Sequence, residues 1–262
     1  MISPFLVASF VNRVEAALTA LRRGELVLLY DADGREGETD LVVASQFATP
    51  DILRALRTGG GGLVCTVVAP EHHQKLGLPY LADLLHSQAK ASPVLAEMEA
   101  NDLRYDPSKS SFGITINHRQ TYTGIPDADR SLTVVELARF LGGIDGLDPV
   151  AARKSFGAAF RTPGHCILLN AREGGLAARQ GHTELSLELA RQAGLVPSTT
   201  ICEMLDASSG RALSKKDAQA YAKANGLVFL TGQDVLDAWQ KQSSPAVPTQ
   251  ALPRAASVPT SA

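Results

Sequence analysis

The chain has 262 residues, 45% of them hydrophobic, with a formal net charge of −2 and a pI of about 6.3. This length provides for one large domain or two small ones with a substantial core. The near-neutral charge gives no reason to expect nucleic acid or an anionic membrane as a partner. No stretch reaches about 18 uninterrupted apolar residues and the first residues lack a basic segment, so neither membrane insertion nor secretion is expected.

The cysteines indicate a reduced, cytoplasmic chain. Cys65, Cys166 and Cys202 are far apart, with no CxxC spacing and no histidine at zinc-finger distance. Each falls in an apolar run, which is typical of a buried thiol in a reducing compartment.

Helix and strand signals alternate along the first half of the chain. An N-terminal helix that ends at a C-cap glycine is predicted by Val11, Val14, Leu18, Leu21 and Gly24. Thr49, Pro50 and Asp51 form a helix start, because proline is favoured at the first helical position and an acid in the first turn. The other segments predicted are strands at 25–30 and 41–44, the helix end at glycines 59–62, a strand at 63–68, a short helix at 70–76 and a polar, mobile excursion at 80–111.

The second half continues this alternation up to a biased tail. Its first part predicts a strand at 112–116, a hairpin-like return at 121–126, an acidic turn at 127–130, a helix opened by a capping box at 133–136, a loop-rich region at 142–163, a strand at 166–169 and a turn at 173–175. Its second part predicts a helix at 185–193 ending at Gly194, a strand at 199–205, a helix capped by 214–217 and ended by Gly226, a strand at 227–230 and a helix at 234–240. Residues 243–262 are dominated by Ser, Pro, Ala, Thr and Val, which predicts disorder. The alternation across 1–242 favours one α/β or α+β domain.

The stretch from Asp31 to Asp40 carries five carboxylates and one arginine in ten residues. It joins two apolar runs and therefore leaves a buried strand as a short loop. If it is extended, period-two alternation places Glu36, Glu38 and Asp40 on one face and Arg35 toward the other. Three converging carboxylates favour a hard divalent cation such as Mg²⁺ or Mn²⁺. The alternative is a solvated acidic loop.

The segment from Arg179 to Thr183 precedes a predicted helix and suits an anion such as phosphate. Backbone N–H groups at the helix N-terminus, the Thr183 hydroxyl and the Arg179 guanidinium can hold such an anion together. The alternative is that Thr183 only caps the helix and that Arg179 lies on the surface. His182 in this turn either completes a metal shell with a carboxylate or is structural.

Two further residues suit proton transfer. His165 ends the sequence Thr162-Pro-Gly-His165, which is predicted to be a rigid turn that presents the imidazole before a buried strand, as a general acid or base needs. Glu203 is flanked by apolar residues, which predicts a raised carboxyl pKa. The alternatives are that His165 has only a structural role and that Glu203 is a strand residue that faces water.

Together these motifs resemble the family of 3,4-dihydroxy-2-butanone 4-phosphate synthase. The resemblance spans about residues 12–240 and rests on six segments in order: Asp31–Asp40, Gly62–Cys65, Thr123–Arg130, Thr162–His165, Arg179–Glu184 and Cys202–Glu203. Six motifs in register are more specific than any one of them. In the acidic loop, Gly34, Gly37 and Thr39 depart from the common bacterial pattern and resemble the archaeal-type branch.

The resemblance implies a single α+β domain over residues 1–242, built as an α/β/α layered sandwich with a mixed sheet. The implied activity is that of a Mg²⁺-dependent lyase of riboflavin biosynthesis, which converts D-ribulose 5-phosphate into L-3,4-dihydroxy-2-butanone 4-phosphate and formate. Two Mg²⁺ ions, which Mn²⁺ is expected to be able to replace, are implied, with no organic cofactor. A cytoplasmic homodimer is implied as well, with one residue from 118–130 reaching across it. No fused GTP cyclohydrolase II domain is expected.

Individual residues inherit expected roles from the resemblance. Glu36 and His182 match metal ligands, with Glu38 nearby. The residues expected at the substrate are Arg35, Glu36, Asp40, Arg179, Gln180, Gly181, His182, Thr183 and Glu203, of which Arg179 and Thr183 match phosphate-binding positions. Proton transfer is expected from His165 and Glu203. Asp31 and Cys65 are expected to line the same pocket as catalytic candidates.

Two functions of other classes remain open. A metal-dependent sugar-phosphate isomerase or aldolase would use the same acids and the same phosphate turn, and formate release distinguishes the synthase from it. A non-catalytic sugar-phosphate-binding module would tolerate the loss of His165 or Glu203. A nicotinamide-dependent enzyme is poorly supported, because no GxGxxG motif follows a predicted strand.

Overall fold

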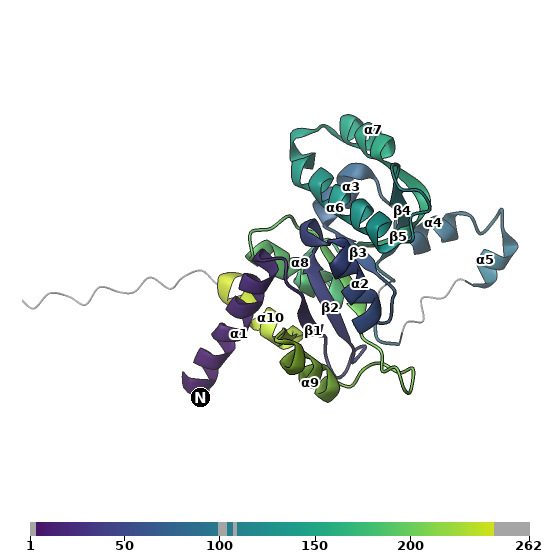
Figure 1. Ribbon diagram of the computed structural model, residues 1–262. Coiled ribbons are helices and arrows are strands. Elements are labelled where there is room, and N and C mark those ends of the chain that lie inside the picture. Colours follow the sequence, from purple (N-terminus) through teal and green to yellow (C-terminus); the bar gives the residue numbers. More distant parts are fainter. Residues whose placement is uncertain (1–3, 99–103, 107–108, 244–262) are drawn as a thin grey trace, which may run out of the picture.

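The computed structural model describes residues 4–98, 104–106 and 109–243. Its strands are β1 Val27–Tyr30, β2 Thr39–Ala44, β3 Cys65–Val68, β4 Phe112–His118, β5 Phe160–Asn170, β6 Thr199–Glu203 and β7 Val228–Thr231. They form one seven-stranded sheet in the order β4-β5-β3-β6-β2-β1-β7 (Figure 1). Neighbouring strands are antiparallel except for the parallel pairs β3 with β5 and β1 with β7. The sheet is therefore mixed.

Helices cover both faces of this sheet (Figure 1). They are α1 Pro4–Arg22, α2 Pro50–Gly59, α3 Pro70–Leu76, α4 Leu81–Ser87, α5 Pro93–Glu97, α6 Asp127–Gly143, α7 Pro149–Ala159, α8 His182–Gln192, α9 Lys215–Asn225 and α10 Gly232–Ser243. One core packs the sheet against α2, α6 and α9, and the other packs it against α1, α8 and α10. In β2, Leu41 and Val43 join the first core and Val42 joins the second, as the alternation along a strand requires. The expected α+β fold, an α/β/α sandwich with a mixed sheet, is confirmed.

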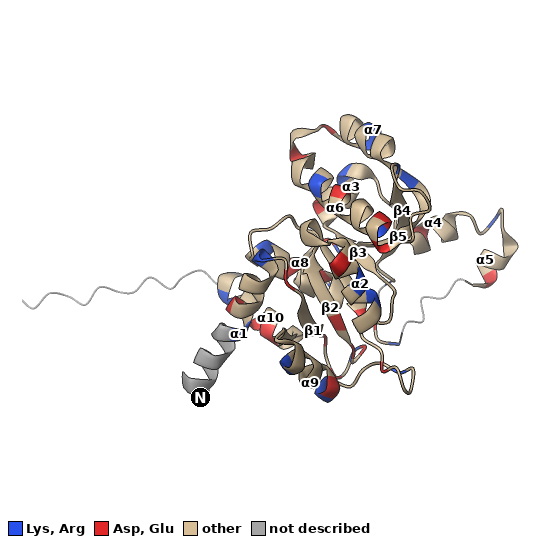
Figure 2. Ribbon diagram, viewed as in Figure 1, with Lys and Arg blue, Asp and Glu red and all other residues tan. Residues whose placement is uncertain are grey.

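The outward sides of the helices carry charges of both signs, for example on α9 (Figure 2). Such interspersed charges are typical of faces in contact with solvent. Among the described residues, no helix combines the length and the apolarity that crossing a bilayer requires.

Short-range signals located most of the elements correctly. Thr49 caps α2 by accepting a hydrogen bond from the N–H of Ile52 at 3.3 Å, and Ser214 caps α9 by accepting one from Asp217 at 3.1 Å. Glycines with positive φ follow the ends of α1, α8 and α9, where a left-handed residue is needed: Gly24, Gly194 and Gly226. The predicted strands around 27–30, 41–44, 65–68, 199–203 and 228–230 are confirmed.

Residues 133–136 are helical as predicted, but the other predictions for 121–136 are wrong. Residues 121–126 form no strand, because β4 pairs with β5 rather than with a hairpin-like return. Residues 127–130 are the first turn of α6 instead of a separate acidic turn. Thr133 lies inside α6, where its hydroxyl donates to the carbonyl of Asp129 at 3.0 Å and accepts from the N–H of His118 at 2.9 Å. It therefore opens no capping box.

The loop predicted at 142–163 is also wrong. It contains α7, which Asp148 caps through the N–H groups of Val150 and Ala151. Its last residues belong to β5, so the turn predicted at 162–165 lies within a strand. Because Arg161 pairs with Asn117 and Cys166 with Ile116, residues 162–165 bulge out of the ladder.

The polar excursion from 80 to 111 contains two short helices, α4 and α5, which the sequence reading missed. Neither buries a residue, so the hydrophobic periodicity that reveals other helices is lacking. The side chain of Val11 and the tail from residue 244 onward lie outside the described residues, and the disorder of that tail stays a prediction.

Candidate active site

The loop between β1 and β2 is folded around the side chain of Asp31, which is 3% exposed. Its Oδ2 accepts the N–H of Glu36 at 3.0 Å, and its Oδ1 accepts the N–H of Glu38 at 3.1 Å. Nη1 of Arg35 donates to the same Oδ2 at 3.2 Å and lies 2.9 Å from Oε1 of Glu36. Gly37 allows this path because its φ of +69° is accessible to glycine without strain. The loop is therefore a turn, and the expected placement of Arg35 away from the acids is wrong.

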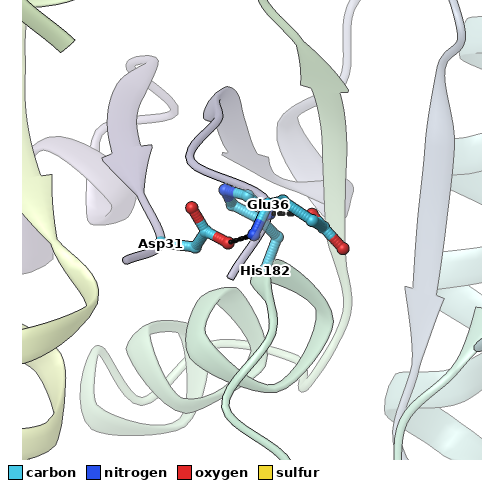
Figure 3. Close-up of side chains that lie close together, drawn as sticks. All are labelled: Asp31, Glu36 and His182. Carbon is cyan, nitrogen blue, oxygen red and sulfur yellow. Dashed lines mark hydrogen bonds and ion pairs between the residues drawn. The ribbon is translucent and has the colours of Figure 1, made fainter. Parts of the chain in front are cut away.

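Strand pairing and one helix bring distant residues to this loop. Antiparallel pairing of β2 with β6 places Asp40 opposite Glu203. The first residue of α8, His182, has Nδ1 3.1 Å from Oε2 of Glu36 and Nε2 3.6 Å from Oδ1 of Asp40. Figure 3 shows this imidazole pointing toward the acidic loop. The carboxylates thus surround one buried histidine.

These side chains share a pocket of about 210 Å³. Its lining is Glu36, Glu38, Asp40, Tyr105, Ser110, Ser111, Phe112, Leu169, Arg179, His182, Thr183, Ile201 and Glu203. Every charged member of this set was named from the sequence. The acidic loop, the ends of β2 and β6 and the start of α8 therefore form one site, as the order of the motifs predicted.

Crowding of the carboxylates shifts their proton affinities. Burial raises the pKa of Asp40 to about 8 despite the opposing charge of His182, and the nearby Glu203, Glu36 and Glu38 contribute repulsion. Burial and then Glu36 raise the pKa of Glu38, and burial is the main cause of the raised pKa of Glu203, which confirms its predicted direction. Burial opposes protonation of His182, yet Asp40 and Glu36 raise its pKa to about 9. The site therefore holds protons more tightly than isolated side chains would, and a bound cation would compete with them.

This donor set fits a divalent cation. Ligand atoms of Asp31, Glu36 and His182 all lie within 4.8 Å of one another. Oδ1 of Asp40 is buried and has no hydrogen-bond partner among the described residues, so it is available to a ligand. Asp31 is committed to the backbone N–H groups of its own loop, whereas Glu36 and His182 contact each other at 3.1 Å and can both turn to a cation between them. Oxygen donors with one imidazole suit Mg²⁺ or Mn²⁺.

Two arginines meet at the start of α8. A Cβ on Gly181, the N-cap residue, would lie 2.4 Å from Nη1 of Arg179 and 2.6 Å from Nη2 of Arg35, so a side chain there would displace both guanidinium groups. Thr183 lines the pocket within the first turn of α8 and does not cap it, because Gly181 holds the cap position. With the unpaired N–H groups of the helix start, Arg35, Arg179 and Thr183 form what we call the arginine corner. The surface placement of Arg179 is wrong, because its side chain is only 10% exposed.

Six candidates are absent from the lining of this pocket. Asp31, Arg35 and Gly181 lie directly beside its lining residues Glu36 and Arg179, and the other three are described next. Cys65 is 1% exposed, and burial together with nearby carboxylates raises its thiol pKa well above the usual value. Gln180 lines a separate pocket of about 270 Å³ together with Asp31 and Asp33 of the acidic loop. His165 is exposed on the β5 bulge, where its N–H donates to Oδ1 of Asn117 at 2.8 Å. Within the described chain, none of these three residues lines the pocket that contains Glu36 and His182.

Two acids that hold Arg179 were missed. Oδ2 of Asp106 is 2.6 Å from Nε of Arg179, and Oε2 of Glu184 is 2.7 Å from its Nη1. Glu184 follows Thr183 directly, and an acid in the first turn of a helix is a recognisable signal. Asp106 lies in the polar excursion, where no local pattern marks it.

Comparison with known proteins agrees with this geometry. A family model for 3,4-dihydroxy-2-butanone 4-phosphate synthase matches residues 15–238. The synthase of Methanothermobacter thermautotrophicus is 43% identical over 231 residues, which cover 88% of this chain and 97% of that protein. The synthase of Methanosarcina acetivorans is 46% identical over 230 residues, which cover 87% of this chain and 91% of that protein.

Solved structures share the fold at lower identity. The synthase of Candida albicans superposes with a TM-score of 0.65 at 28% identity and covers 86% of this chain and 96% of its own. A synthase in complex with two magnesium ions gives a TM-score of 0.66 at 28% identity, covering 87% and 96%. The chain therefore belongs to the 3,4-dihydroxy-2-butanone 4-phosphate synthase family of riboflavin biosynthesis enzymes.

Proposed function

We propose that the chain converts D-ribulose 5-phosphate into L-3,4-dihydroxy-2-butanone 4-phosphate and formate, with divalent cations as its only cofactors. The observation that carries this proposal is a single pocket that joins Glu36, Asp40 and His182 to the arginine corner. A ketose phosphate offers complementary groups, since it has several sugar oxygens and one phosphate dianion. Family membership supports the same assignment.

The phosphate is expected at the arginine corner. Arg179, the hydroxyl of Thr183 and the N–H groups of the first turn of α8 provide donors of the kind that phosphate binds. Arg35 and Asp40 would then contact the sugar. The carbon chain would then lie in the same pocket as Glu203.

The metal ligands are expected to be Glu36 and His182, with Glu38 and Asp40 close by. Two Mg²⁺ ions bound there would stabilise negative charge on the sugar oxygens. A nitrogen donor among oxygens also suits Mn²⁺, so we propose that Mn²⁺ can replace Mg²⁺. All atoms of the substrate are present in the two products, so the reaction needs no external oxidant or reductant.

Proton transfer in this pocket is assigned to Glu203. Its raised pKa, caused mainly by burial, brings proton uptake and release closer to neutral pH. It lies opposite Asp40 across two paired strands, so the sheet fixes its position. It can accept the proton beside the substrate carbonyl and return a proton in a later step.

His165 is the second proposed proton carrier, and we propose that it acts across a homodimer. It is exposed, and Nδ2 of Asn117 lies 3.1 Å from its Nδ1 and 3.2 Å from the carbonyl oxygen of Thr123. Next to this point, Tyr122 is 94% exposed and Ile125 is 50% exposed. Exposed apolar side chains beside a candidate residue suit a surface that a second copy covers.

The products distinguish the proposed reaction from its rivals. Ribulose 5-phosphate labelled uniformly with ¹³C would be incubated with the protein and Mg²⁺ and followed by NMR. We expect labelled formate and a four-carbon phosphate in equal amounts. A five-carbon product would indicate an isomerase, a pair of shorter sugars would indicate an aldolase, and unchanged substrate that nevertheless binds would indicate a binding module.

A further inference from the structure

A buried carboxylate already occupies the arginine corner. Asp106 is 5% exposed, and its Oδ2 lies 2.6 Å from Nε of Arg179 and 3.5 Å from Nη2 of Arg35. A single oxygen atom therefore bridges the two guanidinium groups that converge on Gly181. Asp106 belongs neither to the acidic loop nor to the first turn of α8.

Asp106 is not needed to anchor Arg179. Glu184 is 1% exposed, and its Oε2 lies 2.7 Å from Nη1 of Arg179. Oε1 of Glu184 accepts the N–H of Arg172 at 3.0 Å, which fixes this carboxylate in the first turn of α8. Arg179 thus keeps a buried ionic partner without Asp106.

Asp106 does occupy donors that an anionic ligand would use. A guanidinium binds phosphate best through two parallel N–H groups on one edge, and Nε belongs to such an edge. With Nε given to Asp106, a phosphate can use that edge only after the carboxylate leaves. A dianion beside an ionised Asp106 would also meet like-charge repulsion in a poorly hydrated site.

We propose that Asp106 is an intramolecular competitor for the phosphate of the substrate at the arginine corner. This inference rests on the proposed placement of that phosphate. The carboxylate and the phosphate then exclude each other, so the affinity for any phosphate-bearing ligand is reduced by the fraction of molecules in which Asp106 holds the arginines. Asp106 would thereby set the concentration of sugar phosphate that the enzyme needs.

Binding of inorganic phosphate to the metal-free full chain, measured by titration calorimetry, tests this proposal. Asp106→Asn is expected to tighten the dissociation constant by about tenfold, equivalent to about 1.4 kcal/mol. Asp51→Asn is the matched control, because it removes one negative charge from an exposed pair with Arg54 on α2, across the sheet from α8. That control should leave phosphate affinity unchanged. Equal or weaker phosphate binding by Asp106→Asn would overturn the proposal and make Asp106 a residue that positions Arg179.

Three more variants test whether the effect comes from misfolding or from phosphate bound elsewhere. Asp106→Ser removes the charge through a different side chain and should give the same gain, whereas Asp106→Glu keeps the charge and should bind phosphate about as weakly as the parent chain. Thr183→Val added to Asp106→Asn should reverse the gain if the phosphate lies at the arginine corner. Failure of both neutral variants to bind more tightly, at an unchanged melting temperature, would refute the competition.

Phosphate titration and a formate assay together distinguish a failure of this inference from a failure of the proposed function. Tighter phosphate binding without formate release from ribulose 5-phosphate would refute the proposed reaction and leave the competition intact. Formate release with unchanged phosphate affinity in Asp106→Asn would support the proposed reaction and refute the competition.

Discussion

Asp40 and Glu203 face each other across the antiparallel strands β2 and β6, and both line the same pocket as His182. Residues directly opposite in such a ladder have Cβ atoms about 4.5–5.5 Å apart, and like charges there are destabilising. Burial raises the pKa of both carboxyls, that of Asp40 to about 8. Repulsion from Glu203 adds to the shift at Asp40, and repulsion from Glu36 adds to the shift at Glu203. The sheet therefore tolerates a local electrostatic cost at the position where we propose that a cation binds.

The stability of the metal-free protein is expected to fall as the pH rises from 6.5 toward about 9. The pKa of His182 is raised from 6.5 to about 9, so its stabilisation is complete below 6.5 and is lost as the pH rises through 9. Asp40 acts in the same direction between 3.8 and about 8, because the folded state keeps a proton that the unfolded chain has released. Urea unfolding in EDTA across this range measures the slope.

Saturating Mg²⁺ should make the free energy of unfolding depend less on pH, because the metal binds the deprotonated donors and competes with the proton. His182→Asn removes the titrating group and should weaken the dependence without metal. Stability that stays constant or increases with pH in EDTA would contradict the charge arrangement described for this pocket.

Removing Arg179 is expected to destabilise the fold as well as weaken phosphate binding. Arg179→Gln leaves Glu184, which is 1% exposed, without its ionic partner. Breaking a buried pair from one side costs about 3–5 kcal/mol, so the free energy of unfolding should fall by about that amount. Adding Glu184→Gln should recover part of the loss.

The exposed pair of Arg191 with Glu71 provides the control for that series. Arg191→Gln removes the same charge and length of side chain, yet surface pairs contribute only about 0–1 kcal/mol. Equal losses for Arg179→Gln and Arg191→Gln in chemical unfolding would show that burial does not strengthen the Arg179 pair.

The three thiols are expected to be unreactive in the folded protein. Cys65, Cys166 and Cys202 are all buried, and burial is the main cause of their raised pKa, about 12 for the last two. The thiolate is the reactive form, so a disulfide reagent near neutral pH should label no cysteine until the chain is unfolded, when all three react. Rapid labelling of Cys65 in the native state would contradict this expectation and support Cys65 as a catalytic candidate.

The fold was predictable where local chemistry determines it. Pro50 after Thr49, Ser214 before α9 and the positive-φ glycines each specify one element end from adjacent residues. Thr133 was misread because a threonine followed by an acid three residues later also occurs inside helices, and only the contact with His118 from β4 shows its actual role. The signal for α7, Asp148 before Pro149, was obscured by neighbouring glycines and by a helix that buries only Ala152.

The site residues likewise divide into those that local motifs reveal and those that only long-range contacts reveal. Glu36, Asp40, His182 and Glu203 were predictable because each lies in a motif whose chemistry is local, and strand pairing then brings the motifs together. Asp106 could not be predicted, because its role depends on contact with Arg179, 73 positions away in sequence. The single folded chain likewise leaves His165 outside the pocket, because its position depends on the β5 bulge.

Formate release from D-ribulose 5-phosphate is the most direct test of the proposed reaction and of the pocket that carries it. The assay compares Mg²⁺ with EDTA, and the parent chain with Glu36→Gln and with Glu71→Gln, which neutralises an exposed acid instead. We predict formate only with metal, undiminished in Glu71→Gln and reduced at least about 100-fold in Glu36→Gln. Formate release that survives EDTA or the loss of Glu36, or no formate from the parent chain with Mg²⁺, would contradict the account.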